Sequence, residues 1–386
     1  MIRQIPPKVM LVAAENSGDI HGAALVQAVR RKGFDWRFFG LGGDRLAEAG
    51  LRLLGHVNET AVMGLVEVLG SLGRLLAVRN RLRRALELER PDLLVLIDAP
   101  DFNLPLARHA HSLGLPVVYY ICPAVWAWRS SRLKTLAVCA RRRVVLFPFE
   151  KRFYEDRGVS ADWVGHPILD ELPPKAPAPL AKAAFGLDPL KPLAALLPGS
   201  RRQVLARLAP VFFKAADRLL DMAPDLALAL PRAETIDHGF LEPFLARAPT
   251  RVRQRLLVTS GRSQELLGAA DLVLAASGTA SVEAMFLGTP QVVAYKGHPL
   301  SWAIARRLVK APFVSIANLL AGREIVPELL QDRVTPEALA TAAWPLLADP
   351  ASVARIREDL AEARSGLGGP GASARVANIL AEELER

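Results

Sequence analysis

Cysteine, aromatic residues and long apolar runs are scarce in this chain of 386 residues. Its two cysteines, Cys122 and Cys139, cannot form a disulfide framework, which indicates a reducing compartment. No apolar run approaches the roughly 18 residues that cross a bilayer. The N-terminus runs into an expected strand without the apolar core of a signal peptide. We therefore expect a soluble or peripheral cytoplasmic protein.

Patterns that bind metals or nucleic acids are also missing. The longest basic block is Arg141-Arg142-Arg143, with no zinc-finger spacing and no ribonucleoprotein aromatic motif. His109 and His111 resemble a metal pair, but residues two apart do not share a helix face. We expect no metal site and no cofactor. The net charge of +10 nevertheless indicates an anionic partner: nucleic acid, acidic phospholipid or a phosphorylated substrate.

The length and a proline-dense segment in the middle of the chain predict two domains. Apolar strands alternate with helical stretches in both halves, which predicts an α/β fold with a doubly wound parallel sheet in each domain. Two such domains joined by a hinge would face each other across a cleft. The expected parts are a first domain over 1–172, a Pro-rich linker over 173–192, a second domain over 193–349, and C-terminal helices over 350–386. These last helices would return to the first domain or pack on a partner subunit.

The segment from Asp271 to Glu283 is typical of an anion site. An apolar strand over 271–276 precedes a helix, and the turn between them consists of small and hydroxyl residues: Ser277, Gly278, Thr279, Ala280 and Ser281. Backbone N–H groups and the positive end of the helix favour a phosphate there. Glu283 follows one turn later, where a carboxylate can bind ribose hydroxyls. Ordinary helix capping is the alternative.

Two further groups of polar residues follow glycine turns in the second half. Gly199 and Ser200 precede Arg201 at an expected helix start, where a guanidinium could hold a diphosphate. A surface arginine is the alternative. Side chains near a later glycine turn could bind sugar hydroxyls, with capping as the alternative: Asn318, Glu328 and Gln331.

In the first half, Asp98 follows the clearest strand, 93–97. An acid at the end of a buried strand, facing a cleft, can act as the general base for a sugar hydroxyl. The alternative is that Asp98 or Asp101 caps the next helix.

Residues 61–84 combine an apolar helical repeat with a cluster of arginines that begins at Arg74. Such a segment suits the surface of an anionic membrane. An ordinary packed helix with a solvated basic end is the alternative. The apolar members, at three- and four-residue spacing, are Val62, Leu65, Val66, Leu69, Leu72 and Leu76.

Eight segments, in order over about 10–331, resemble the lipid-A-disaccharide synthases, glycosyltransferases of the GT-B architecture. They are residues 14–19, 63–68, 97–103, 125–128, 147–150, 197–201, 277–280 and 318–322. Asn16, Ala124, Val204 and Ala317 depart from the family pattern, Val204 standing where an acid is expected.

The resemblance implies an inverting transfer of 2,3-diacylglucosamine from UDP-2,3-diacylglucosamine to the 6-hydroxyl of 2,3-diacylglucosamine 1-phosphate (lipid X). The products would be lipid A disaccharide 1-phosphate and UDP. Asp98 would be the base, Arg201 and the 277–281 turn would hold the diphosphate, and Glu283 the ribose. The remaining donor contacts would be Asn318, Glu328 and Gln331, and the acceptor side would include Glu15, Ser17 and Met63.

Acylated substrates favour the interfacial interpretation of 61–84, so we expect the chain at the inner face of the inner membrane, without nucleic acid. A homodimer is left open. The rivals are a UDP-sugar epimerase, a different membrane-associated sugar transferase, and a non-catalytic nucleic-acid-binding protein.

Overall fold

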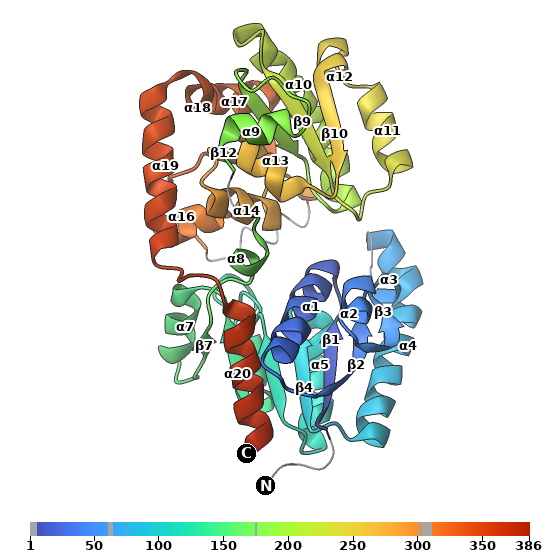
Figure 1. Cartoon of the computed structure of the whole chain (residues 1–386). Helices are drawn as coiled ribbons and strands as arrows, with labels where there is room; N and C mark the ends of the chain where they lie inside the picture. Colours follow the sequence, from blue (N-terminus) through green and yellow to red (C-terminus); the bar gives the residue numbers. More distant parts are fainter. Residues whose placement is uncertain (1–5, 61–64, 174–175, 300–301, 303–310) are drawn as a thin grey trace. The chain divides into compact units, whose positions relative to one another are not determined.

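The computed structural model describes residues 6–60, 65–173, 176–299, 302 and 311–386, with side chains of the helix at Leu65 described from Gly73 onward. The chain divides into two compact units (Figure 1). Unit 1 comprises Met1–Glu171 and Leu367–Arg386, and unit 2 comprises Leu172–Gly366.

Unit 1 is built on a seven-stranded sheet in the order β3-β2-β1-β4-β5-β6-β7, and its paired strands are parallel. The order reverses between β1 and β4, which is the topological switch point where doubly wound folds bind ligands. The strands are β1 (Lys8–Ala13), β2 (Arg37–Gly42), β3 (Arg52–His56), β4 (Leu93–Ile97), β5 (Val117–Tyr120), β6 (Arg142–Val145) and β7 (Asp162–Trp163).

Helices cover both faces of this sheet. Alternate residues of β1 and β4, such as Met10 and Leu94, form one core with Val78, Leu82 and Leu106 on the overlying helices α4 and α5. Helix α1 packs against the other face and contacts α20. The helices are α1 (Asn16–Arg31), α2 (Asp44–Glu48), α3 (Val57–Thr60), α4 (Leu65–Glu89), α5 (Pro100–Ser112), α6 (Arg132–Cys139), α7 (Pro148–Glu155), α8 (Ile168–Glu171) and α20 (Ala372–Glu385).

Unit 2 repeats the architecture with a six-stranded parallel sheet in the order β10-β9-β8-β11-β12-β13. Its switch point therefore lies between β8 and β11. The strands are β8 (Leu193–Leu197), β9 (Ala227–Arg232), β10 (Leu256–Ser260), β11 (Leu272–Ala276), β12 (Gln291–Tyr295) and β13 (Glu328–Leu330). The predicted fold, with two doubly wound parallel sheets, is confirmed.

The helices of unit 2 also form two layers. Helices α13 and α14 share a core with β8 and β11, while α10 packs with α17. The helices are α9 (Ala178–Ala183), α10 (Arg202–Met222), α11 (His238–Ala246), α12 (Thr250–Arg255), α13 (Ser263–Ala269), α14 (Thr279–Leu287), α16 (Ile316–Ala321), the 3-10 turn η1 (Gln331–Arg333), α17 (Pro336–Ala343), α18 (Pro345–Ala348) and α19 (Pro350–Ser365).

Two of the expected parts can be compared with this division. In the described residues of the predicted Pro-rich linker over 173–192, α9 packs on α13 and the buried Lys182 donates to Asp271 at 2.7 Å, so α9 belongs to unit 2. The tail over 350–386 is divided, since α19 belongs to unit 2 and α20 to unit 1.

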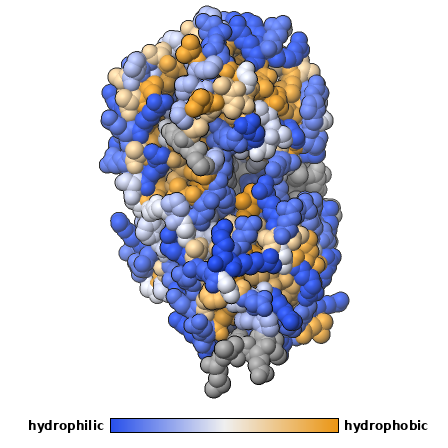
Figure 2. Space-filling view, in the orientation of Figure 1, coloured by the Kyte–Doolittle hydropathy of each residue, from blue (hydrophilic) through white to orange (hydrophobic). Residues whose placement is uncertain are grey.

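The face of the molecule shown in Figure 2 is largely polar. Hydrophilic side chains cover most of the face shown in Figure 2, with smaller apolar areas between them. Across the described ranges, every helix is too short or too polar to cross a membrane.

Candidate functional site

The two predicted anion turns of unit 2 lie at neighbouring strand ends. Strand β8 pairs with β11 in parallel, with Leu197 opposite Ala275. The turn at Gly199–Arg201 and the turn at Ser277–Thr279 follow these strands, so they meet at the switch point of the sheet. Helices α10 and α14 begin directly after the two turns, which brings two helix N-termini to the same edge.

The turn after β11 has the accessible backbone that an anion needs. Gly278 is the N-cap of α14, with φ of 148°, and both Gly278 and Thr279 are exposed. Such a φ favours glycine, and a Cβ built there would meet nothing within 4 Å. The Ser281 hydroxyl donates to the Gly278 carbonyl at 2.7 Å and closes the turn. The N-cap residue itself is Gly278, but Ser281 Oγ also accepts the Gly278 N–H at 3.4 Å, so a serine takes part in capping α14, as the capping alternative expected.

The turn after β8 is fixed from outside the helix that follows it. Thr235 donates its hydroxyl to the Ser200 carbonyl oxygen at 2.6 Å. Gly199 has φ of 121°, and a Cβ there would come within 2.8 Å of Val204. Arg201 is exposed at the N-cap of α10 and makes no capping bond with its side chain. The guanidinium is thus carried by a rigid turn without being needed to cap the helix.

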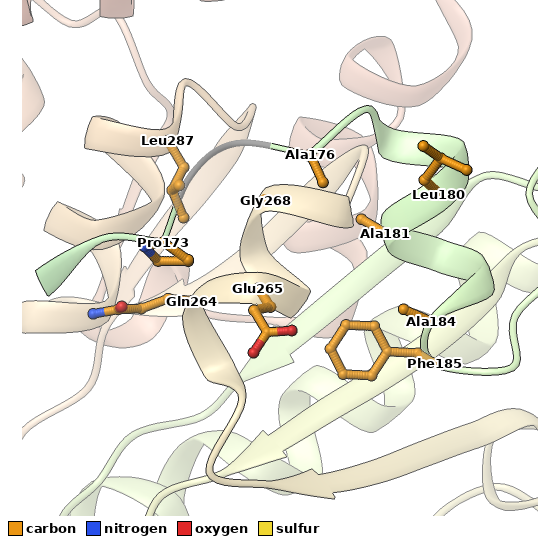
Figure 3. Close-up of a pocket in the computed structure, with 10 residues that line it drawn as sticks. All are labelled: Pro173, Ala176, Leu180, Ala181, Ala184, Phe185, Gln264, Glu265, Gly268 and Leu287. Atoms are coloured by element: carbon orange, nitrogen blue, oxygen red, sulfur yellow. The ribbon is translucent and has the colours of Figure 1, made fainter.

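Glu283 lies one turn into α14 and is oriented by a neighbouring helix. Its Oε1 accepts a hydrogen bond from Nε2 of Gln264 on α13 at 3.1 Å. Gln264 also lines a cavity of about 230 Å³ with Phe185 and Leu287, shown in Figure 3. The cavity walls are mainly apolar, so this cavity does not fit a diphosphate.

Two of the predicted donor contacts, Asn318 and Glu328, make hydrogen bonds within unit 2. Asn318 is fully buried, and its amide donates to Val326 O and Glu328 Oε1 and accepts from the N–H groups of Ile325 and Val326. These four bonds use its whole capacity. Its carboxylate partner, Glu328, also accepts from Val314 N at 3.0 Å and Ser315 N at 2.7 Å. Both side chains therefore hold the backbone before α16.

Gln331 is different, because its side chain has capacity left. It is 9 % exposed, has φ of 52° at the end of β13, and its Nε2 has no hydrogen-bond partner among the described residues. A non-glycine residue with positive φ carries backbone strain, which occurs often at binding sites. A buried N–H donor without a partner is costly, so Gln331 is the better candidate for a ligand contact.

In unit 1, the backbone at Asp98 is held from three sides. Its N–H donates to Tyr120 O at 3.0 Å, and its carbonyl oxygen accepts from Tyr119 Oη at 2.7 Å and Asn103 Nδ2 at 2.8 Å. Asp98 is half-buried, with φ of 47°. The N-cap of α5 is Ala99, and Asp101 instead pairs with Arg129 and Arg132. Neither aspartate thus takes the N-cap position, and Asp98 lies at the β1–β4 switch point.

Glu150 is a buried carboxyl group that the residue patterns did not single out. Its Oε1 accepts from Trp126 Nε1 at 3.1 Å, and its Oε2 accepts from Leu146 N at 3.0 Å and Phe147 N at 3.1 Å. It joins the loop after β5 to the start of α7. Burial raises the pKa of Glu150 to about 7, and the Asp98 charge adds to the rise.

Glu150 should make stability depend on pH. With the folded pKa raised from 4.5 to about 7, its stabilising contribution is full below 4.5 and is lost as pH rises through 7. Relative to Glu150→Gln, the wild type should lose about 3 kcal/mol across this interval. Urea unfolding of both proteins at pH 4.5 to 8 measures the difference. Glu155→Gln, on the same helix and paired with Lys151, is the control, and a pH-independent difference would contradict the buried carboxyl.

The predicted acceptor residues are only partly described. Glu15, at the N-cap of α1, is exposed, and Ser17 is half-buried in the first turn of the same helix. Both follow β1 and so lie on the other side of the switch point from Asp98. Met63 lies outside the described residues.

Helix α4 includes most of the 61–84 segment, for which a membrane contact and an ordinary packed helix were the two interpretations. Arg74 and Leu76 are exposed, but Val78, Leu82 and Leu86 are buried in the core, so this end of α4 is an ordinary packed helix. The remaining predicted membrane contacts are not covered: Val62 lies outside the described residues, as do the side chains of Leu65, Val66, Leu69 and Leu72.

Within the described ranges, no group of three or more His, Cys, Asp or Glu side chains is arranged to hold a metal ion. His109 instead pairs through Nε2 with Glu87 at 2.9 Å.

Residue patterns missed three side chains that orient the site: Asn103, Glu150 and Gln264. A partial signal existed only for Glu150, which stands at the third position of a helix that opens with Pro148, where glutamate accepts N-terminal N–H bonds. Gln264 acts through Glu283, which is distant in the chain, and Asn103 donates to the carbonyl oxygens of Ile97 and Asp98, at a spacing that no helix or strand repeat predicts.

Comparison with known proteins adds a close sequence match. The model of the lipid-A-disaccharide synthetase family matches residues 9–382. The lipid-A-disaccharide synthase of Azotobacter vinelandii is 48% identical over 341 residues, covering 88% of this chain and 89% of that protein. The synthase of Geobacter sulfurreducens is 41% identical over 377 residues, covering 98% and 97%.

Solved structures share the fold at much lower identity. A putative UDP-N-acetylglucosamine 2-epimerase from Listeria monocytogenes superposes with a TM-score of 0.69 at 16% identity, covering 99% of this chain and 97% of that one. The glycotransferase of kitacinnamycin gives 0.64 at 18% identity, covering 98% and 99%. The epimerase likeness therefore concerns the fold alone.

Proposed function

The chain belongs to the lipid-A-disaccharide synthase family, glycosyltransferases of lipid A biosynthesis, and from this premise we propose its substrates and mechanism. The donor is UDP-2,3-diacylglucosamine and the acceptor is 2,3-diacylglucosamine 1-phosphate. The products are the β-1,6-linked disaccharide 1-phosphate and UDP. The observation that carries this proposal is the pair of glycine turns at the β8–β11 switch point, where two helix N-termini and Arg201 gather.

On the donor side, this chain's own residues would hold the nucleotide. The exposed turn at Gly278 and Thr279 binds the diphosphate through the Thr279 N–H and the positive end of α14, and Arg201 offsets the charge that develops on the leaving UDP. Glu283, oriented by Gln264, binds the ribose hydroxyls. Gln331 directs its unsatisfied amide toward the donor sugar, while Asn318 and Glu328 support the neighbouring backbone.

On the acceptor side, Asp98 takes the proton from the 6-hydroxyl as its oxygen attacks the anomeric carbon of the donor. One bond forms between that oxygen and the carbon as the bond from the carbon to the UDP oxygen breaks. Because attack comes from the face opposite the leaving group, an α-linked donor gives a β-linked product. Glu15 and Ser17 help to shape the acceptor side beside Asp98.

We also propose that the enzyme works at the cytoplasmic face of the inner membrane, because both substrates carry acyl chains. The net charge of +10 would attract an anionic surface. The exposed Arg74 and Leu76 suit this contact.

The test is UDP release by the full chain in nonionic detergent, with donor alone and with donor plus acceptor. Release should depend on the acceptor, and mass and anomeric proton coupling should show one β-linked disaccharide phosphate. Equal release without acceptor, an α-linked product, or conversion of the donor to an epimer would each overturn the proposal.

A further inference from the structure

Two arginines in the loop after β5 share one carboxylate of unit 1. Arg129 donates to Asp101 Oδ1 at 2.9 Å, and Arg132, at the start of α6, bonds the same oxygen. The side chain of Asp101 is 78% exposed, whereas that of Arg132 is 17% exposed. Two cations against one anion leave a net positive charge, and the carboxylate that they share is solvated.

The backbone of Arg129 is strained, and the ion pair with Asp101 is too weak to account for that strain. Arg129 has φ of 51°, and its guanidinium lies 4.6 Å from the ring of Trp128. A non-glycine residue in this left-handed conformation is strained. An exposed ion pair stabilises a protein only slightly. This backbone conformation sets the direction of the Arg129 side chain, and the contact with the Trp128 ring helps to hold the guanidinium in place.

The cluster lies beside the proposed base. Asp101 is three residues beyond Asp98, in the first turn of α5. Burial raises the pKa of the Tyr119 phenol. The charges of Asp98 and Asp101 raise this pKa further, and the charge of Arg132 lowers it. These groups therefore all act on the phenol that donates to the Asp98 carbonyl oxygen.

We propose that Arg129 and Arg132 bind the phosphomonoester of the acceptor, displacing the Asp101 carboxylate. A phosphate dianion offers three oxygens to guanidinium groups, which bind phosphate in a bidentate manner. Release of Asp101 costs little because that carboxylate is solvated. The site fixes the sugar by the end opposite its attacking hydroxyl, and this assignment rests on the proposed function.

The test compares the natural acceptor with its analogue that lacks the 1-phosphate, in nonionic detergent without phospholipid. In Arg129→Gln and Arg132→Gln, the KM for the phosphorylated acceptor should rise about tenfold each, since a hydrogen bond to a charged group contributes about 1.5–3 kcal/mol. The kcat and the donor KM should not change. The phosphate-free analogue should show the same KM in wild type and variants.

Two further variants separate binding from folding. Arg132→Lys should recover part of the affinity because it keeps the charge. Arg108→Gln is the matched control, since Arg108 also reaches from α5 to α6, where it donates to Thr135 at 2.9 Å. Its KM should equal that of the wild type.

Three results would overturn the assignment: no change in KM, an equal rise in KM for both acceptors, or variants that lose only their binding to phospholipid. Cosedimentation with phosphatidylglycerol vesicles measures this binding and shows whether the arginines bind lipid headgroups instead. If the wild type turns over neither acceptor, the proposed function fails. Calorimetric binding of the phosphorylated and phosphate-free acceptors to the same variants then still decides the phosphate site.

Discussion

Asp98→Asn is expected to lower kcat by about 10²–10⁴-fold, the range for loss of a general base. Asparagine keeps the size of the side chain and tolerates the left-handed backbone at φ of 47°, where alanine would add strain. The bonds from Asn103 and Tyr119 go to the backbone carbonyl oxygen, so they survive the substitution. Steady-state kinetics and donor titration measure the effect.

The affinity for the donor should stay within twofold, because the proposed donor groups belong to unit 2. Asp35→Asn is the control, since Asp35 is exposed just before β2, at the amino end of the sheet. An Asp98→Asn protein with wild-type kcat would remove Asp98 from the mechanism. Equal losses in both variants would point to a general effect on folding.

Arg201→Ala is expected to lower kcat by about 10²–10³-fold, as the loss of one group that stabilises developing charge does. The same substitution should weaken UDP binding, because the leaving diphosphate is also the product. Stability should change little, because Arg201 is an exposed residue and substitutions at the surface usually change the free energy of unfolding only slightly. Kinetics, UDP titration and thermal unfolding measure the three quantities.

Arg218→Ala is the matched control for Arg201. It removes another exposed arginine from α10, one that pairs with Glu337 on α17. Full activity in Arg201→Ala would exclude the guanidinium from charge stabilisation. If Arg201→Ala loses activity but binds UDP as tightly as the wild type, Arg201 stabilises the transition state and does not contribute to UDP binding.

Local patterns were sufficient to predict most of the fold. Strands such as β4 and β11 are short, fully buried and bounded by turn residues, and these features are all readable in sequence. The short strands β3, β7 and β13 were not predicted, because glycine, charge or brevity hides their pattern. The proline-rich composition over 173–192 predicted a linker, and it gave no sign of the Lys182–Asp271 bond that fixes α9 to unit 2.

The candidate site was less predictable because polar residues near turns can face either solvent or the interior. Arg201 and Gly278 are exposed at their turns, where the pattern predicted an anion site. Asn318 stands in a similar sequence context, yet its four hydrogen bonds are all internal. Only the positions of partners distant in the chain, such as Val326 and Glu328, separate the two outcomes.

The place of α20 determines how this enzyme can be dissected. The helix buries Val376 and Leu380 in unit 1, and Arg375 Nε donates to Val164 O at 2.7 Å. A fragment ending at Glu171 would leave the α1 surface uncovered and lose this contact. To isolate unit 1 with all its native contacts, the chain must be circularly permuted, with residues 367–386 joined by a linker ahead of the native N-terminus.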